Sequence, residues 1–458
     1  MNQANTRDFN AYDEYIERHF SNMVVELREF CSKPTLAGQR IGLEEGVTAV
    51  HELLEPLGAR THVVPVGNEG PPVILAELGA KRPTLLLYNH YDVQPPEPLE
   101  LWDSPPYAGE VRDGKFYARG VADDRGDLLS RVLAIRAYQA TMGELPLRIR
   151  WLIEGEEEVG SPNLAHVVEQ HAEELQADWC AWEGSWRETN DIPQIICGGK
   201  GILYIELHAT GPNHDAHSMK GGVLPNPIWR LVMALSTLRD ERGNFVMDGL
   251  DQIVDPPAQA EIKAADAMPF AEEDELAVYG LNGWQRGLKG REVLYTEMFE
   301  PTANIAGFTS GYSGPGAKTI VPSKAMVKMD FRLVPRQTPE KMLDLLRAHF
   351  DARGFNDIEI VQLAALHPAK TAVDSPLVQV SADVWRDLGE NNVMIAPMTG
   401  GSGPVSLISA GLGVPTVVTG GVAFAESRVH SPNESIRLAD FKTSIRYWGR
   451  FFAKLADL

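Results

Sequence analysis

The chain has 458 residues, of which 63 are acidic and 42 are basic, so its formal net charge is −21. At about 150 residues per domain, this length corresponds to two or three domains or to one large domain with an insertion. The apolar fraction of 44 % excludes wholesale disorder, and the negative charge argues against binding to nucleic-acid phosphates or to anionic membranes.

The cysteines and the hydropathy pattern bear on the cellular location of the protein. Three cysteines without a CxxC spacing predict neither a disulfide framework nor a thiolate zinc site. The first residues lack the apolar segment of a secretory signal, and no run of 18 apolar residues is present to span a membrane. We therefore expect a cytoplasmic protein that binds neither membranes nor nucleic acids.

Helical and strand patterns alternate in the first 195 residues. Helices are predicted over residues 10–31, 42–57, 125–142 and 161–176. Strands are predicted over residues 62–66, 73–78, 84–88, 148–154 and 178–182. This alternation is typical of an α/β domain with helices on both faces of a sheet.

The pattern changes near residue 195 and changes back near residue 370. Between these points we expect an α+β unit on an antiparallel sheet, with an irregular segment at 241–300 and a solvated acidic run at 272–275. Its predicted strands are 195–196, 203–209, 319–321, 325–333 and 358–363, and its predicted helices are 227–238 and 339–350. The α/β style then returns with helices at 376–388, 405–410 and 439–456, a strand at 415–419 and a glycine-rich turn at 400–403. An inserted domain explains this return.

His90 and Asp92 stand at the end of the predicted strand 84–88. Side chains two residues apart on a strand point to the same side, and strand ends are where α/β domains place their ligand sites. A metal-binding histidine usually donates its other ring N–H to an oxygen acceptor, a position that suits Asp92. The alternative is a surface histidine followed by a solvated aspartate.

Further acids and a second histidine also follow predicted strands or precede a helix. Taken singly, they are also explained by helix capping or by solvated turns. They are Asp123, Asp124, Glu157, Glu158, Glu183 and His430. If they share one crevice, cations must offset the repulsion between the carboxylates. Nitrogen and oxygen ligands suit Zn²⁺, Co²⁺ or Mn²⁺, and a two-metal site of this kind favours amide hydrolysis.

These motifs together resemble the di-zinc exopeptidase and deacylase family that contains aminoacylase, carnosine dipeptidases, glutamate carboxypeptidase and succinyl-diaminopimelate desuccinylase. The resemblance spans residues 40–435 and is greatest to the dipeptidase branch. It implies an α/β fold, with a three-layer catalytic domain on a mixed sheet formed by residues 1–198 and 369–458. An inserted α+β lid and dimerisation domain is implied at residues 199–368.

The resemblance implies a role for each residue around the metals and a cis peptide bond between Asp123 and Asp124. Two divalent ions per subunit are expected, with Zn²⁺ preferred and Co²⁺ or Mn²⁺ as alternatives. The implied roles are first-metal ligands His90 and Glu183, bridging ligand Asp123, second-metal ligands Glu158 and His430, general base Glu157 and orienting residue Asp92.

The lid supplies the remaining implied residues. His217 is similar to the family histidine that reaches across a homodimer to the substrate carbonyl, whereas the nearby His214 is interpreted as a surface residue. Arg332 is similar to the arginine that binds the substrate carboxylate in a bidentate manner. The other predicted substrate-binding residues are Asn304, Thr319, Gly401 and Ser402.

The substrate is expected to be a dipeptide or another small peptide with a free carboxylate. Two positions favour a different hydrolase, a deacylase of N-acyl amino acids, because Glu183 and Thr399 replace acids that are typical of dipeptidases of the carnosine type. An inactive amino-acid-binding or scaffold homologue is the alternative from another class. It would be expected to lack a ligand or the general base, and here every such position holds a competent residue.

Overall fold

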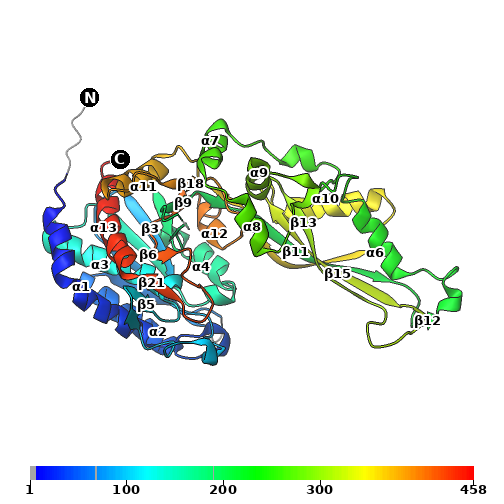
Figure 1. The fold of residues 1–458 in the computed structure, drawn as a ribbon, viewed down its shortest axis with the longest axis horizontal. Helices are drawn as coiled ribbons and strands as arrows, with labels where there is room; N and C mark the ends of the chain where they lie inside the picture. Colours follow the sequence, from blue (N-terminus) through cyan, green and yellow to red (C-terminus); the bar gives the residue numbers. More distant parts are fainter. Residues whose placement is uncertain (1–6, 68–69, 189) are drawn as a thin grey trace. The chain divides into compact units, whose positions relative to one another are not determined.

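The structure, a computed structural model, describes residues 7–67, 70–188 and 190–458 (Figure 1). These residues divide into two compact units. The first runs to Cys197 and includes Thr371–Pro397 and Leu407–Leu458, and the second consists of Gly198–Lys370 and Met398–Ser406. The predicted division was 1–198 and 369–458 against 199–368.

The first unit is built on an eight-stranded mixed sheet with the strand order β1-β2-β6-β3-β7-β19-β9-β18. Its centre is parallel from β6 through β3 and β7 to β19, while β1 and β2 run antiparallel at one edge. Every residue of β3 is buried, as expected for a strand covered on both faces. The strand bounds are β1 Arg60–Val64, β2 Val73–Leu78, β3 Thr84–His90, β6 Arg148–Glu154, β7 Trp179–Trp182, β9 Gln194–Ile196, β18 Met394–Ala396 and β19 Thr416–Val418.

Helices complete the three layers of this unit. Helices α1, α3, α11 and α13 pack on one another, and α3 also contacts β3, so that α3 is buried over most of its length. Helix α5 contacts β6 and lies with α4 on the other face. The bounds are α1 Asn10–Cys31, α2 Leu43–Leu54, α3 Gly126–Thr141, α4 Leu164–Gln170, α5 Ala172–Leu175, α11 Pro376–Asp387 and α13 Leu438–Leu455. Helix α12, Val405–Ser409, begins in residues of the second unit and ends in residues of the first. This arrangement confirms the predicted α/β class.

One predicted helix of the first unit is in fact two. Residues 161–176 were expected to form a single helix, but α4 ends at Gln170 and α5 begins at Ala172. His171, between them, has φ −110° and ψ 22°, outside the helical range. The chain therefore bends at His171.

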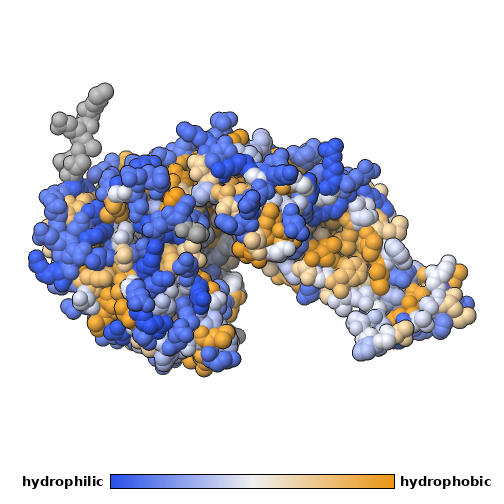
Figure 2. All heavy atoms as spheres, in the orientation of Figure 1, coloured by the Kyte–Doolittle hydropathy of each residue, from blue (hydrophilic) through white to orange (hydrophobic). Residues whose placement is uncertain are grey.

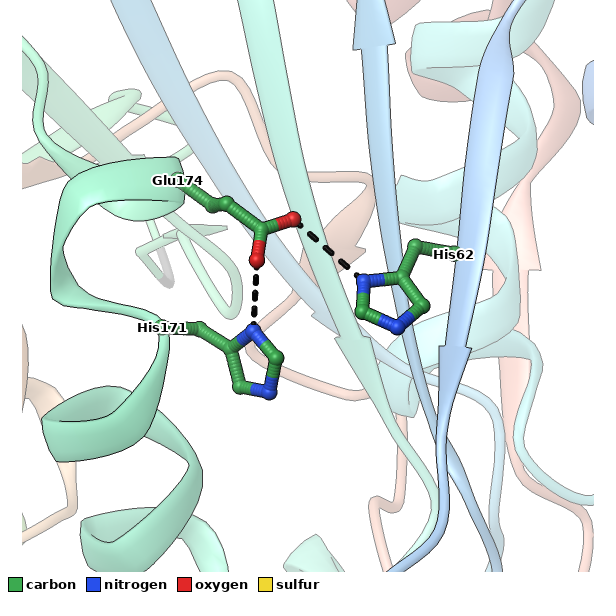
Figure 3. A group of neighbouring side chains, drawn as sticks. All are labelled: His62, His171 and Glu174. Carbon is green, nitrogen blue, oxygen red and sulfur yellow. Dashed lines mark hydrogen bonds and ion pairs between the residues drawn. The ribbon is translucent and has the colours of Figure 1, made fainter.

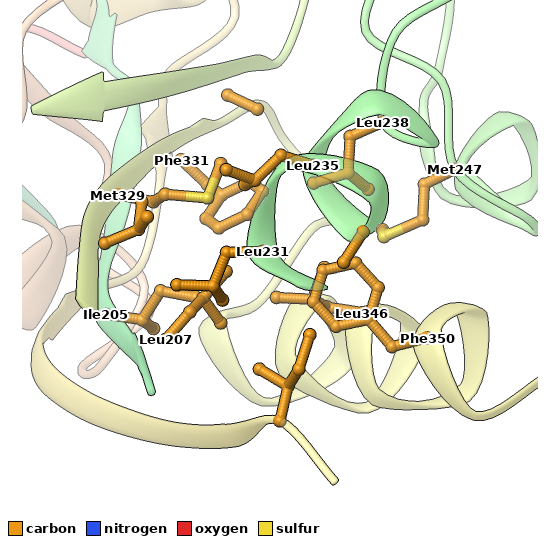
Figure 4. Close-up of a cluster of buried hydrophobic side chains, with 14 of the residues drawn as sticks. Ile205, Leu207, Leu231, Leu235, Leu238, Met247, Met329, Phe331, Leu346 and Phe350 are labelled. Atoms are coloured by element: carbon orange, nitrogen blue, oxygen red, sulfur yellow. The ribbon is translucent and has the colours of Figure 1, made fainter. Parts of the chain in front are cut away.

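The second unit has a four-stranded antiparallel sheet in the order β13-β15-β11-β16. Residues alternate between buried and partly exposed along β11, because one face packs on α6 and α10 and the other does not. Figure 4 shows the resulting core, in which Leu231 and Leu235 of α6 meet Ile205, Phe331 and Phe350. The bounds are β11 Gly201–Thr210, β13 Thr302–Ser310, β15 Lys324–Leu333, β16 Glu359–Leu366, α6 Pro227–Ser236 and α10 Pro339–Ala352.

The prediction of an irregular segment at 241–300 was wrong. It contains helices α7 (Gln259–Ala267), α8 (Glu272–Val278) and α9 (Arg291–Phe299). Helix α8 has no buried residue. It therefore needs no apolar stripe, and its sequence lacks the pattern from which an amphipathic helix is predicted. The expectation that residues 272–275 are solvated agrees with this exposure.

Residues 398–406 belong to the second unit, although they were assigned with the catalytic domain from the sequence. Met398 packs in a small apolar cluster with Ala265, Leu294 and Met298. The backbone N–H of Thr399 donates to Gly198 O at 2.9 Å, which ties the segment to the start of the same unit. These contacts explain why residues 398–406 group with the second unit.

Short strands complete the described structure. They are β4 Glu110–Arg112, β5 Lys115–Tyr117, β8 Trp186–Arg187, β10 Gly198–Gly199, β12 Ala216–His217, β14 Ile320–Val321, β17 Ala369–Lys370, β20 Ala423–Phe424 and β21 Ser435–Arg437. Among the residues that the structure describes, no helix is both long and apolar enough to cross a membrane.

Candidate metal centre

Three parallel strands of the first unit, β6, β3 and β7, end side by side and carry the candidate site. His90 is the last residue of β3 and pairs with Glu154 at the end of β6. Glu157 and Glu158 follow β6 within four residues, and Glu183 directly follows β7. Because the carboxyl ends of parallel strands meet at one edge of a sheet, these side chains converge there.

The ring of His90 is fully buried and is held from both sides. Its Nδ1 lies 3.0 Å from the backbone oxygen of Asp92 and 3.3 Å from Asp92 Oδ1. This leaves Nε2 facing the site, 3.0 Å from Asp123 Oδ1. Although burial opposes protonation, the nearby carboxylates of Glu183, Asp123 and Asp92 raise the pKa of His90 well above its usual value.

Asp123 lies between the two predicted histidine ligands. Its Oδ1 is 3.0 Å from His90 Nε2, and its Oδ2 is 3.0 Å from His430 Nε2. Burial would raise the pKa of Asp123, but the hydrogen bonds with His430 and His90 outweigh burial and lower it. The peptide bond between Asp123 and Asp124 is cis, as the family resemblance implied.

The remaining predicted ligands approach from two sides. Glu158 Oε2 lies 3.1 Å from His430 Nε2 and also accepts a hydrogen bond from Gln94 Nε2 at 2.9 Å. Glu183 Oε2 lies 4.0 Å from His90 Nε2, and burial raises the pKa of Glu183 well above its usual value. Single ligand atoms of His90, Asp123 and Glu158 lie within 4.8 Å of one another, and the same holds for His90, Asp124 and Glu183.

These residues fit a divalent cation. Among the described residues, the buried Glu183 Oε2 and Asp124 Oδ1 have no hydrogen-bond partner, and a buried polar atom without a partner is costly. Two imidazoles and several carboxylates, without a thiolate, are the donor set that zinc and related ions accept. A cation would both satisfy these oxygens and offset the repulsion between the carboxylates.

Glu157 is adjacent to Glu158 but is outside the groups of ligand atoms. The turn that carries both residues is fixed by Asp92, whose Oδ1 accepts from the Glu157 N–H at 3.3 Å and whose Oδ2 accepts from the Glu158 N–H at 3.1 Å. Burial raises the pKa of Glu157 to about 7. The structure thus places a carboxyl group with an unusually high proton affinity beside the cluster.

Two acids support the site although the sequence assigned neither of them a specific role there. Asp124 accepts hydrogen bonds from the side chain of Asn89 at 2.6 Å and from the His90 N–H at 3.0 Å, so it fixes the end of β3. The Glu434 carboxylate accepts hydrogen bonds from Arg119 Nη1 at 2.6 Å and from the Ala122 N–H at 2.9 Å. Glu434 therefore fastens the loop before Asp123 to the segment that carries His430. Both acids stand beside predicted ligands in the sequence, and their burial is the signal that was missing.

The predicted substrate-binding residues all belong to the second unit, where they form two groups. In one, Arg332 Nη1 donates to Ser402 Oγ at 2.8 Å, and Gly401 N–H donates to Thr399 Oγ1 at 2.8 Å. Asn304 pairs with Asp330, two residues before Arg332 on the same strand, through a 2.8 Å hydrogen bond. In the other group, His217 on β12 pairs with Ile320 on β14, directly after Thr319. The ring of His217 is exposed and accepts from the Met219 N–H at 3.1 Å.

Comparison with known proteins identifies relatives that match most of the chain. Residues 86–454 match the sequence profile described as Peptidase family M20/M25/M40. Beta-Ala-His dipeptidase of Rattus norvegicus is 26 % identical over 471 residues, covering 97 % of this chain and 95 % of the relative. Cys-Gly metallodipeptidase DUG1 of Saccharomyces cerevisiae is 32 % identical over 291 residues, covering 62 % of this chain and 60 % of the relative.

A solved structure matches at similar identity. The M20 family metallo-carboxypeptidase Sso-CP2 from Sulfolobus solfataricus is 32 % identical, with a TM-score of 0.85, and the match covers 95 % of this chain and 99 % of that chain.

Proposed function

Because the chain belongs to peptidase family M20/M25/M40 and is therefore a metal-dependent hydrolase of peptides, we propose that its candidate metal centre hydrolyses dipeptides and other short peptides with a free carboxylate. The relatives named above are two dipeptidases and a carboxypeptidase, which supports a small peptide as the substrate. The single observation that carries the proposal is the Asp123 carboxylate, with its two oxygens 3.0 Å from the Nε2 atoms of His90 and His430.

Two divalent ions are assigned to this cluster. His90 and Glu183 would hold one ion, Glu158 and His430 the other, and Asp123 would bridge them. Zn²⁺ suits this donor set best, with Co²⁺ and Mn²⁺ as alternatives. When bound, such ions polarise a substrate carbonyl and lower the pKa of a coordinated water.

Glu157 is proposed as the general base. It lies next to a ligand residue, and the contacts of Asp92 fix its backbone while leaving its carboxylate outside the ligand groups. In the proposed reaction, Glu157 accepts a proton from the attacking water and later donates it to the nitrogen of the leaving amine. General acid–base catalysis of this kind contributes a factor of about 10²–10⁴.

The second unit is proposed to bind the substrate. Arg332 would pair with the terminal carboxylate, since a guanidinium forms two parallel hydrogen bonds with a carboxylate. Ser402, which already contacts Arg332, and Gly401 would bind the substrate backbone, with Asn304 and Thr319 as further contacts. His217 would donate to the oxyanion in the site of a partner subunit.

The surface of the second unit supports a homodimer formed through this lid. Large apolar side chains are exposed on and before α6, and Figure 2 shows apolar residues gathered on this unit. The most exposed are Val223 at 78 %, Met219 at 77 %, Trp229 at 65 % and Met233 at 59 %. Patches of this kind typically mark protein–protein contacts. A cytoplasmic location remains our expectation for the dimer.

The proposal is tested by a panel of three compounds with one scissile peptide bond: a dipeptide, its N-acetyl form and its C-terminal amide. The enzyme is assayed with measured metal content, before and after chelation. We expect hydrolysis of the free dipeptide, little hydrolysis of the amide, and loss of activity on chelation that Zn²⁺, Co²⁺ or Mn²⁺ restores. Preference for the N-acetyl form would favour the deacylase, which the threonine at position 399 supports, and activity that survives complete metal removal would contradict the metal centre.

A further inference from the structure

A second cluster of metal-binding side chains lies at the edge of the main sheet in the first unit. It consists of His62 on the edge strand β1, His171 between α4 and α5, and Glu174 on α5 (Figure 3). One ligand atom from each residue lies within 4.8 Å of the other two. We call these three residues the edge cluster. None of them belongs to the candidate metal centre.

We propose that the edge cluster binds one Zn²⁺ ion and thereby fastens strand β1 to helices α4 and α5. The two imidazoles and the carboxylate form a donor set that suits Zn²⁺. The inference does not depend on the proposed function, because the edge cluster and the candidate metal centre share no residue.

The two rings already point their Nδ1 atoms at one carboxylate. His171 Nδ1 lies 2.6 Å from Glu174 Oε1, and His62 Nδ1 lies 3.3 Å from Glu174 Oε2. Figure 3 shows one carboxylate oxygen turned toward each ring. Ligand atoms at the usual Zn–N and Zn–O distances of about 2.0–2.2 Å stand about 3.4 Å apart in a tetrahedron. Small rotations of the exposed His62 and Glu174 side chains, beside the partly buried His171, therefore suffice to admit the ion.

The backbone holds the three residues in place before any ion binds. Arg150 of β6 donates to the carbonyl oxygens of Glu173 and Gln176, at 2.7 Å and 2.6 Å, and so fixes the turn of α5 that carries Glu174. His62 is fixed by the pairing of β1 with β2, opposite Leu75. Preorganised ligands of this kind lose less conformational entropy when they bind an ion.

The alternation of side chains along β1 places His62 on the face of the strand that contacts α5. Thr61, the preceding residue, has its hydroxyl 3.3 Å from His51 Nδ1 on α2, whereas His62 turns to α5. Successive side chains on a strand point to opposite faces, so α2 and α5 contact opposite sides of β1. An ion on His62 would therefore add a link on the side where β1 meets α4 and α5.

The charge and the solvent access of the cluster also suit a cation. Glu174 supplies the carboxylate of the edge cluster, and its side chain is 51 % exposed. The nearby positive charge of Arg150 is paired with Glu77 at 3.4 Å. A surface cavity of ≈ 390 Å³ lined by His62 and Glu174 gives the ion access and leaves room for water as a fourth ligand.

The test compares zinc binding and thermal unfolding of the full chain, loaded beforehand at its candidate metal centre. The variants are H62Q/H171Q, which removes both nitrogens, and E174Q, which keeps the size of the acid but removes its charge. His166→Gln is the matched control, because His166 is an exposed histidine of α4 outside the cluster. Zinc per chain is measured after equilibrium dialysis at several free Zn²⁺ concentrations, and Tm is measured in parallel.

We expect the wild type and His166→Gln to hold one more Zn²⁺ per chain than H62Q/H171Q, and E174Q to bind this ion more weakly. At free Zn²⁺ about ten times the Kd, the Tm of the wild type should rise by about 1.5 °C, and that of H62Q/H171Q should not. Equal zinc content and an equal Tm response in the wild type and H62Q/H171Q would overturn the proposal. Peptide hydrolysis should be the same in all four proteins, so this outcome is separate from a failure of the proposed function.

Discussion

The carboxylate of Asp92 is hydrogen-bonded to the backbone of Glu157, with Oδ1 3.3 Å from the Glu157 nitrogen. The same oxygen lies 3.3 Å from His90 Nδ1, and Oδ2 accepts from the Glu158 N–H. A single buried aspartate thus links the end of β3 to the turn after β6. It sets the relative position of a proposed ligand and the proposed general base.

Asp92→Asn should weaken metal binding and slow catalysis together. An asparagine has one side-chain oxygen, so it cannot accept from both backbone N–H groups and also hold the His90 ring. Loss of a group that orients a ligand typically costs a factor of 10–100 in metal affinity or activity. The Kd for Zn²⁺, measured by competition with a chelator, and kcat should both change. Asp113→Asn, at an exposed turn, is the control, and wild-type values for Asp92→Asn would contradict the assigned role.

Arg332→Lys should reduce kcat/KM for a free dipeptide but not for the corresponding dipeptide amide. A lysine keeps the charge but loses the bidentate geometry, and a hydrogen bond to a charged group is worth about 1.5–3 kcal/mol, or about a factor of 10–150. Steady-state kinetics on both substrates measure the difference. Arg336→Lys, on the turn after β15, provides the control. An equal loss on both substrates would show that Arg332 does not bind the carboxylate.

Trp229→Glu should disrupt the proposed homodimer. The side chain is 65 % exposed on α6, and a carboxylate buried in an apolar interface is strongly unfavourable. Size-exclusion chromatography with light scattering should give a dimer for the wild type and a monomer for the variant. Val278→Glu is the matched control, because Val278 is 79 % exposed on α8 of the same unit. A monomeric wild type, or an unchanged dimer with glutamate at position 229, would refute the proposed interface.

His349→Gln should reduce the acid sensitivity of the fold. Burial lowers the pKa of His349, whose Nδ1 accepts from the Asp248 N–H at 3.2 Å and is therefore neutral. Below the unfolded pKa of about 6.5, the histidine binds a proton in the unfolded chain but not in the folded chain. The free energy of unfolding therefore decreases as the pH is lowered, by at most about 1.4 kcal/mol per pH unit for this group.

Unfolding by denaturant at pH 7, 6 and 5 measures this effect. The free energy of unfolding of the wild type should fall more steeply below pH 6.5 than that of His349→Gln. His214→Gln, at an exposed position in the same unit, should keep the wild-type slope. Identical slopes for the wild type and His349→Gln would rule out this contribution.

The regular core and the strand-end acids could be predicted from the sequence because they follow simple rules. The helix predicted at 10–31 is α1, and the strand predicted at 148–154 is β6, since both have a strong apolar pattern. His90 ends one parallel strand, and Glu157 and Glu183 follow two others, so the alternation of elements brings them to one edge.

Elements without a buried stripe could not be predicted in this way. Strand β13 is mostly exposed and contains Ala, Gly and Thr instead of alternating large apolar residues, so it was missed. The supporting roles of Asp124 and Glu434 could not be predicted from the sequence, because these roles depend on burial and on contacts with residues distant in the sequence. The position of 398–406 depends likewise on long-range packing of Met398.

The proposed role of Glu157 is to move protons beside a two-metal centre whose ions it does not itself bind. Glu157→Gln tests it most directly, with kcat and metal content measured on the same preparation. Glu156→Gln is the control, because Glu156 accepts a hydrogen bond from Asn163 at 2.8 Å and has no assigned role in the reaction. We predict that Glu157→Gln lowers kcat by a factor of about 10²–10⁴ while two metal ions per chain remain bound. Near-wild-type turnover with both metals in place would show that Glu157 is not the general base.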